Sequence, residues 1–171
     1  SIISYNIHYG YGIFAFKLYN MIEELKKNNS DIVFLQEVLN NRQFEEIKRY
    51  LGCEYKYTCY YNKLAIFSKY DLNIIEKKQY NNKIISFLGY KIKLYPDTYY
   101  LYATIEINNK IIALINTHLI SDCTFTKQYK DITLLIDKLD TIENPFILMG
   151  DFNLHKINKT CKLNKFTIKD I

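Results

Sequence analysis

A carboxylate and an amide follow a short apolar segment near the end of the chain. Residues 146–149 are apolar and lie between Pro145 and Gly150, a pattern typical of a buried strand. Asp151 and Asn153 come directly after Gly150, and their spacing allows both side chains to face one pocket. Polar groups just beyond a strand are held by a rigid scaffold and stay open to solvent and ligand. This arrangement favours catalysis.

Three further apolar segments also end in polar side chains. An amide, a carboxylate and an imidazole follow them in turn: Asn6 after residues 2–5, Glu37 after residues 32–35, and His118 shortly after residues 111–115. Carboxylate oxygens are the ligands that a hard cation such as Mg²⁺ prefers, and an imidazole titrates near neutral pH, which suits proton transfer. Phosphoester hydrolysis needs an activated water and groups that stabilise charge on the phosphoryl oxygens. The four segments contain groups of these kinds.

Hydrophobic periodicity predicts the elements that must position these groups. Apolar residues recur at helical spacing over residues 14–25, 44–51 and 129–139. Strand patterns cover residues 2–6, 32–35, 55–61, 64–68, 84–93, 99–107, 110–116 and 146–149, with turns at Asn62-Lys63, Pro96-Asp97 and Asn108-Asn109. Hairpins in the middle of the chain with helices on either side indicate two packed sheets. Periodicity leaves the order of the strands open.

The sequence resembles the endonuclease/exonuclease/phosphatase superfamily, the DNase I-like phosphoesterases, over nearly its whole length. The resemblance rests on blocks that occur here in the family's order: Ser4-Tyr-Asn6-Ile, Asp31-Ile-Val-Phe-Leu-Gln-Glu37-Val, Leu64-Ala-Ile-Phe-Ser68, Asn116-Thr-His118-Leu and Gly150-Asp151-Phe-Asn153. The Gly-Asp-Phe-Asn and Leu-Gln-Glu blocks are the most specific of them. The resemblance implies a single domain over residues 1–171 with an α/β (α+β) fold, a four-layer α-β-β-α sandwich of two packed sheets flanked by helices.

The resemblance also implies a role for each polar group. Glu37 is the expected metal ligand, and Asn6 lies beside the cation as a ligand or through a water molecule; the expected ion is Mg²⁺, with Mn²⁺ as an alternative. Asp151 orients or deprotonates the attacking water, and Asn153 holds that carboxylate and the substrate phosphate. His118 contacts the scissile phosphate and acts as an acid toward the leaving group. From the residues alone, each group could instead be structural, as a solvated carboxylate, a turn residue or a satisfied histidine.

These roles predict a divalent-metal-dependent phosphoesterase, and more specifically a phosphodiesterase that acts on nucleic acid or on a phospholipid head group. Nuclease, sphingomyelinase-like and phosphatase activities all stay open. Inositol polyphosphate phosphatases fit less well, because their Pro-Ala-Trp-Cys-Asp-Arg signature is absent and the chain contains no Trp. The alternative is a phosphate-binding remnant of the same fold with little or no turnover. Retention of all the polar groups together argues against that alternative.

The sequence departs from the family at its carboxyl end and before one strand. Family members continue past the Gly-Asp-Phe-Asn block to an Asp-His segment, and no Asp-His dipeptide follows Asn153; His155 comes too early. We therefore expect a C-terminally truncated domain that lacks its final strands, either a fragment or a degenerate member. Many relatives also have a Gly before the strand at residues 64–68 and an Arg after it. This chain has Asn62-Lys63 before that strand. Lys69 follows the strand and keeps the positive charge, but it cannot bind a phosphate through two hydrogen bonds as Arg does.

Composition limits the partners and the compartment. The net charge of +5 and the pI of about 8.8 are compatible with a polyanionic substrate, although the basic residues are spread along the chain. The cysteines, Cys53, Cys59, Cys123 and Cys161, show neither metal-ligand spacing nor the density of a disulfide-rich domain, so we expect reduced thiols. No leader or long apolar run is visible, which favours an intracellular location without a membrane span, although the first residue is Ser and the N-terminus could be incomplete. We expect a monomer without a stable protein partner.

Overall fold

A computed structural model describes residues 1–10, 15–80, 84–87, 90–93, 98–119 and 125–153. The helices of this described part are η1 (His8–Gly10, a 3-10 helix), α1 (Ala15–Asn28), α2 (Asn41–Leu51) and α3 (Phe125–Leu139). Its strands are β1 (Ile2–Asn6), β2 (Ile32–Gln36), β3 (Tyr57–Tyr61), β4 (Leu64–Ser68), β5 (Asn73–Tyr80), β6 (Ile84–Phe87), β7 (Tyr90–Lys93), β8 (Thr98–Ile107), β9 (Lys110–His118) and β10 (Phe146–Asp151). None of the described helices combines the length and the apolar character needed to cross a membrane.

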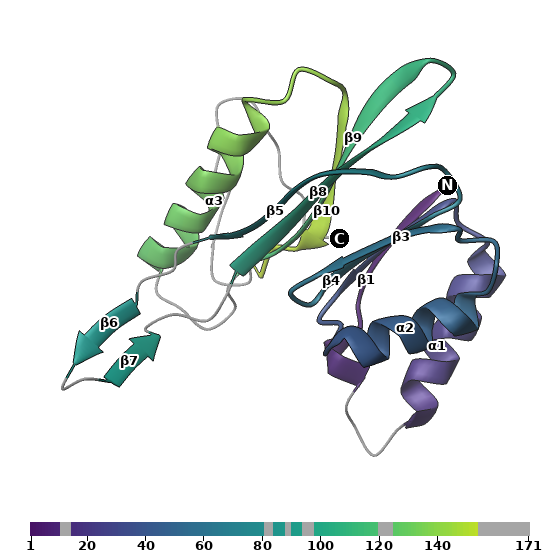
Figure 1. Ribbon diagram of the computed structural model, residues 1–171, viewed down its shortest axis with the longest axis horizontal. Coiled ribbons are helices and arrows are strands. Elements are labelled where there is room, and N and C mark those ends of the chain that lie inside the picture. The colour runs from purple at the N-terminus through teal and green to yellow at the C-terminus, as the bar shows by residue number, and fades with distance from the viewer. Residues whose placement is uncertain (11–14, 81–83, 88–89, 94–97, 120–124, 154–171) are drawn as a thin grey trace.

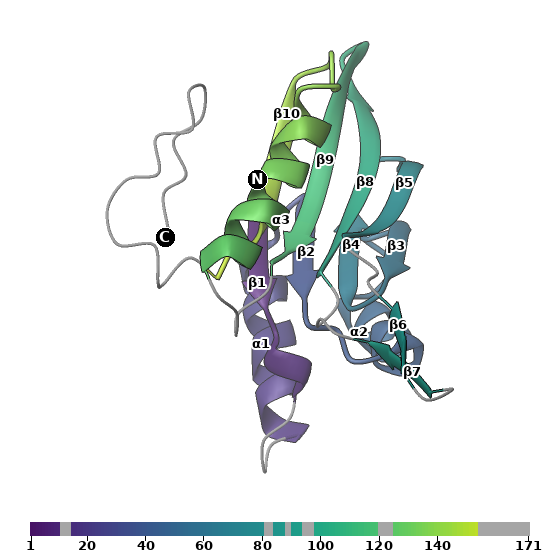
Figure 2. The ribbon, with the colours of Figure 1, turned by 90° about the vertical axis from the view of Figure 1, so that its left-hand side faces the viewer.

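Two sheets of four strands each lie against one another between layers of helix. Their strand orders are β1-β2-β4-β3 and β10-β9-β8-β5, which Figure 2 shows from left to right. In each sheet the first pair is parallel and the other pairs are antiparallel. Helices α1 and α2 cover one sheet and α3 covers the other (Figure 1). The fold is therefore the four-layer α+β sandwich that the sequence predicted.

Alternating side chains of β2 build two of the three layers of core. Val33 and Leu35 pack with the apolar faces of α1 and α2, whereas Ile32 and Phe34 face the second sheet. The third core lies between that second sheet and α3, and its buried members are Tyr100, Tyr102, Ala113, Ile115, Leu119, Ile132, Leu135 and Leu139. Because β2 is buried on both faces, its sequence is a continuous apolar run and not an alternation. Burial of this apolar surface is the main stabilising contribution to the fold.

A buried side-chain amide joins the two sheets. Asn116 on β9 donates hydrogen bonds to the main-chain carbonyl oxygens of Leu35 and Ala65, each at 2.9 Å. Its own Oδ1 accepts a hydrogen bond from Nε2 of Gln36 at 2.8 Å, and Asn116 itself is 0% exposed. These partners lie on β2 and β4 of the opposite sheet, so the amide fixes the ends of β2 and β9 relative to one another. Glu37 and His118 are carried at those two ends.

We expect Asn116→Leu to lower the free energy of unfolding by about 3 kcal/mol, because it leaves two buried carbonyl oxygens and the Gln36 amide without their partner. Urea denaturation followed by circular dichroism measures this loss. Asn73→Leu is the matched control, since Asn73 is exposed at the start of β5, and a change below about 0.5 kcal/mol is expected there. Equal losses in the two variants would contradict the bridging role of Asn116.

Two strand predictions were wrong. The single strand expected at residues 84–93 is divided into β6 and β7, which pair antiparallel with Ile84 opposite Lys93, and Figure 1 shows this hairpin projecting from the sheets. Periodicity could not show the reversal because both halves have strand-like composition, and Gly89 was the available signal. Strand β5 was not predicted at all, because its apolar side chains Ile74 and Ile75 are exposed and charged residues follow them. The predicted turn at Pro96-Asp97 lies outside the described residues.

The thiols that the structure describes are unpaired. Cys53 is exposed and Cys59 is buried between the two sheets. Burial raises the pKa of the Cys59 thiol to about 12, so this group is uncharged at neutral pH and behaves as a small apolar side chain. Cys123 and Cys161 lie outside the described residues.

Candidate active site and metal centre

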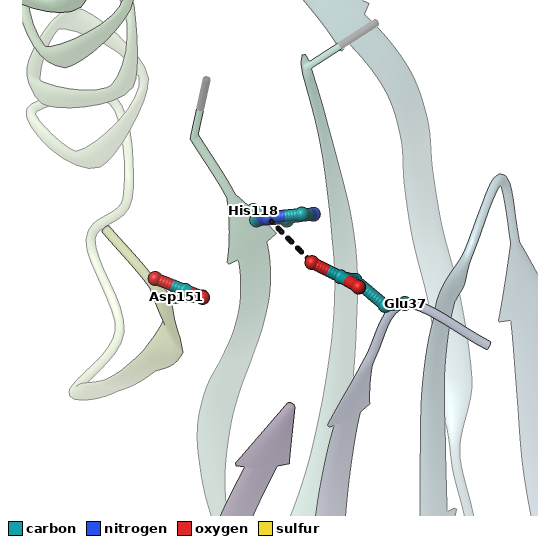
Figure 3. A group of neighbouring side chains, drawn as sticks. All are labelled: Glu37, His118 and Asp151. Atoms are coloured by element: carbon teal, nitrogen blue, oxygen red, sulfur yellow. Dashed lines mark ion pairs between the residues drawn. The ribbon is translucent and has the colours of Figure 1, made fainter. Parts of the chain in front are cut away.

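Three titratable side chains meet where β2, β9 and β10 end. Glu37 directly follows β2, His118 is the last residue of β9 and Asp151 is the last residue of β10. One ligand atom from each side chain lies within 4.8 Å of the others, and Figure 3 shows the group. Because β9 and β10 are parallel with His118 opposite Asp151, the register of this pair alone places those two residues side by side. The packing of the two sheets against one another then brings Glu37, which follows β2, to the same place.

Glu37 is a buried carboxylate with one oxygen left unsatisfied. Its backbone is left-handed, with φ 60°, a conformation that is uncommon outside glycine and that turns the side chain toward the site. Oε1 accepts a hydrogen bond from Asn6 at 3.1 Å and lies 3.6 Å from Nε2 of His118. Oε2 is buried and accepts no hydrogen bond from the described residues, although Nδ1 of His8 lies 3.3 Å away. A buried, unpaired carboxylate oxygen is costly unless a cation satisfies it.

Asn6 clamps the two carboxylates together. Its Nδ2 donates to Oε1 of Glu37 at 3.1 Å and to Oδ2 of Asp151 at 2.7 Å. Its Oδ1 faces the other way and accepts a hydrogen bond from the main-chain N–H of His8 at 2.9 Å. Asn6 therefore lies beside the candidate metal site, with its amide nitrogen and not its oxygen directed at the carboxylates. Serving as an oxygen ligand would require the amide to turn over, so a direct metal bond from Asn6 stays a prediction.

Asp151 is held from three sides. Its Oδ1 accepts a hydrogen bond from the main-chain N–H of Asn153 at 3.0 Å, its Oδ2 accepts the one from Asn6, and its carbonyl oxygen accepts one from Leu119 at 2.9 Å. The side-chain Nδ2 of Asn153 donates to the carbonyl oxygen of Leu119 at 2.8 Å. Asn153 thus orients the Asp151 carboxylate through its backbone and fastens the loop through its side chain. Contact of Asn153 with a substrate phosphate stays a prediction.

His118 is mostly buried at the edge of the site. Burial lowers the pKa of its imidazole below the usual value, and the carboxylates of Asp151 and Glu37 oppose part of that effect, whereas the nearby Lys63 adds to it. The ring is therefore neutral at neutral pH, and its 3.6 Å contact with Glu37 is not an ion pair there. A neutral imidazole presents one N–H donor and one acceptor nitrogen. The N–H can donate a hydrogen bond to a phosphate oxygen or to a leaving oxygen.

The donors of this site fit a hard divalent cation. Two carboxylates lie close together, one of their oxygens is buried without a hydrogen bond, and the third potential ligand is a neutral imidazole. Hard cations such as Mg²⁺ bind through one or two carboxylates and retain water molecules. Without a cation, two neighbouring carboxylates repel one another and one of them stays under-solvated. The composition of the site thus indicates a role for a bound metal.

Four of the residues predicted for the site lie together here, whereas the residues that support them were not predicted. Asn6, Glu37, His118 and Asp151 converge as expected. Gln36 and Asn116, which set the spacing of the sheets, were not proposed as site residues, although a polar side chain inside an apolar strand was a visible signal. Lys69, which the sequence analysis discussed, does not join the group: it pairs with Glu54 at 3.6 Å and lies at the opposite end of β4. His155 is outside the described residues.

Comparisons with known proteins identify the family and similar folds. The model of the endonuclease/exonuclease/phosphatase family matches residues 3–163. A search of curated proteins found no match. The structure of TDP2 from C. elegans is 25% identical with a TM-score of 0.66, and the alignment covers 90% of this chain but 47% of that chain. Sphingomyelinase C from Streptomyces griseocarneus is 16% identical with a TM-score of 0.62, covering 91% of this chain and 65% of the other.

A third structure, D. rerio TDP2 complexed with single strand DNA product, is 22% identical with a TM-score of 0.61, and the alignment covers 90% of this chain and 60% of that one. The chain therefore spans between about half and two thirds of the length of these solved structures. The family model extends over most of the chain. On these grounds the chain belongs to the endonuclease/exonuclease/phosphatase family.

Proposed function

We propose that this chain forms the catalytic part of a divalent-metal-dependent phosphodiesterase that hydrolyses a phosphodiester of nucleic acid or of a phospholipid head group. The buried, unsatisfied Oε2 of Glu37 beside a second, firmly held carboxylate carries the proposal. Family membership supports phosphoric ester hydrolysis. The two substrate classes come from the relatives, one of which is complexed with a single strand DNA product and another of which is named as a sphingomyelinase.

Glu37 would hold the cation, with Asp151 and Asn6 beside it, and the ion would be Mg²⁺ or Mn²⁺. When bound, such a cation stabilises negative charge on phosphoryl oxygens and favours the deprotonation of water. It would also satisfy Oε2 of Glu37, which lacks a hydrogen bond. The neutral state of His118 is compatible with a cation nearby, because a neutral ring adds no repulsive charge.

The chain's own residues supply the remaining steps. Asp151, oriented by Asn6 and by the main-chain N–H of Asn153, accepts the proton of a water molecule whose oxygen attacks phosphorus. The bond between phosphorus and the leaving oxygen then breaks. An N–H of His118 donates to the leaving oxygen or to a non-bridging oxygen of the phosphate and stabilises the charge that develops there. The side chain of Asn153 fixes the loop whose main-chain N–H orients Asp151.

Hydrolysis of a bis-aryl phosphate tests this function. We expect a rate that requires Mg²⁺ or Mn²⁺, that a chelator abolishes, and that Glu37→Gln lowers together with an at least about tenfold loss of affinity for Mn²⁺ measured by calorimetry. Glu106→Gln is the matched control because Glu106 is exposed on β8, and it should change neither quantity. Metal binding that survives in Glu37→Gln would contradict the assignment. Phosphate binding without any hydrolysis would instead identify a non-catalytic remnant.

A further inference from the structure

A two-residue turn beside the active site contains a lysine where the backbone favours glycine. Asn62 and Lys63 connect β3 to β4 with φ values of 41° and 72°. Hairpin turns with positive φ at both positions strongly prefer Asn-Gly, and a residue with a side chain at the second position is strained. The turn between β8 and β9 has the same form with Asn108 and Asn109, at φ 52° and 59°. Asparagine tolerates this conformation far better than lysine does.

Lys63 is attached to the loop that carries Glu37. Its carbonyl oxygen accepts a hydrogen bond from the N–H of Val38 at 3.0 Å, and its Nζ donates to the hydroxyl of Tyr9 at 3.1 Å. The ammonium group lies 4.8 Å from the centre of the Tyr9 ring, and the N–H of Tyr9 donates to the carbonyl oxygen of Glu37 at 3.1 Å. Two contacts therefore join Lys63 to the backbone around Glu37, one through Val38 and one through Tyr9.

The Lys63 ammonium group is held in place, and it has more N–H donors than its hydrogen bond to Tyr9 uses. Tyr9 is fixed by its own left-handed backbone, with φ 58°, and by a hydrogen bond of 2.8 Å from Nε2 of Gln43 to its carbonyl oxygen. A lysine offers three N–H donors, and the hydroxyl of Tyr9 accepts one of them. Within the part of the chain that the structure describes, no carboxylate forms an ion pair with this lysine. The side chain is half-buried, so the charge is partly shielded from water.

An anionic substrate needs such a charge at this site. Glu37 and Asp151 place two carboxylates at the point where a phosphodiester would bind, and both repel a phosphate. A cation held by Glu37 offsets one part of that repulsion, and a lysine on the rim offsets another. A glycine would keep the backbone contact to Val38, which uses only the carbonyl oxygen, but it would lose the contacts of the ammonium group with Tyr9. The contribution specific to the lysine is its ammonium group.

We propose that Lys63, positioned by Tyr9, is a phosphate-binding residue that contacts the substrate phosphate at the rim of the active site. The identity of the substrate as a phosphodiester rests on the proposed function. The chemistry recognised is the phosphate anion itself, whether it belongs to nucleic acid or to a lipid head group. Lys63 would then improve substrate binding at the expense of local backbone stability.

Binding of inorganic phosphate, measured by calorimetry with and without Mg²⁺, tests the proposal without any turnover. We expect Lys63→Gly to weaken phosphate binding by about tenfold, the loss that one charge-assisted hydrogen bond predicts, and to raise the melting temperature because the turn is relaxed. Lys63→Arg should retain most of the binding. Asn109→Gly is the matched control: its melting temperature should also rise or hold, and its phosphate affinity should be unchanged.

Phosphate binding by Lys63→Gly that equals that of the unmodified chain would overturn the proposal, as would an unmodified chain that binds no phosphate. Neither outcome depends on hydrolysis, so loss of the proposed function and loss of this inference are distinguishable. Two further arms identify the source of the phosphate: a short oligothymidylate and vesicles that contain sphingomyelin. A Lys63-dependent loss of binding in either arm supports the proposal and names the source. Unchanged binding in both arms contradicts it.

Discussion

Asp151→Asn is expected to slow metal-dependent hydrolysis of a bis-aryl phosphate by about a thousandfold, the contribution typical of a positioned general base. The substitution keeps the size of the side chain but only one of its two hydrogen bonds, because Asn153 and Asn6 donate to different carboxylate oxygens and an amide has a single oxygen. It removes the ability to accept a proton from water. Initial rates at saturating Mg²⁺ measure the effect, and the melting temperature of the metal-free variant should change little, since the loss of one of two neighbouring negative charges offsets the lost hydrogen bond.

Asp71→Asn is the control for this prediction. Asp71 is exposed and lies between β4 and β5, at the end of β4 away from the site. Its substitution should leave the rate within about twofold of the starting value, as for most exposed positions. An Asp151→Asn variant that is as active as this control would remove Asp151 from the mechanism. A variant that unfolds would instead point to a structural role for the carboxylate.

Gly150→Ala is expected to destabilise the fold by about 4 kcal/mol, in the range reserved for severe backbone clashes. Gly150 has φ 153°, and an added Cβ would overlap the carbonyl oxygen of Thr117 and lie 2.8 Å from its carbonyl carbon. Those atoms belong to the backbone of β9, so no side chain can move aside. Strand β10 would have to separate from β9 at the position next to the Asp151–His118 pair. Urea denaturation and the rate of hydrolysis should both show the loss.

Gly52→Ala separates conformational strain from overlap. Gly52 ends α2 with φ 82°, and nothing lies within 4 Å of an added Cβ. The free energy of unfolding should fall by about 1 kcal/mol, because the only cost is that of placing a side chain in the left-handed region. Losses of equal size at Gly52 and Gly150 would show that the contact with Thr117 does not limit the close approach of β9 and β10.

Local sequence patterns determined most of the elements and the identity of the chemical groups. Apolar spacing indicated the three helices and the buried strands because burial imposes a period that is visible within a few residues. The polar residues at strand ends were equally visible, since each interrupts an apolar run. The patterns failed where burial is weak, as at β5 with its exposed Ile74 and Ile75, and where two similar strands adjoin, as at β6 and β7.

Only the tertiary structure decided how these groups act together. The order of strands, the register that sets His118 opposite Asp151, and the bridge from Asn116 to Leu35 all join residues far apart in the sequence. The orientation of the Asn6 amide and the position of the Lys63 ammonium group over the Tyr9 ring likewise depend on neighbours from other segments. Periodicity reports whether a residue is buried but not which residue it meets. Hydrogen bonds and charges act between specific partners at short range. The interactions within the site could therefore be identified only from the packing of the two sheets.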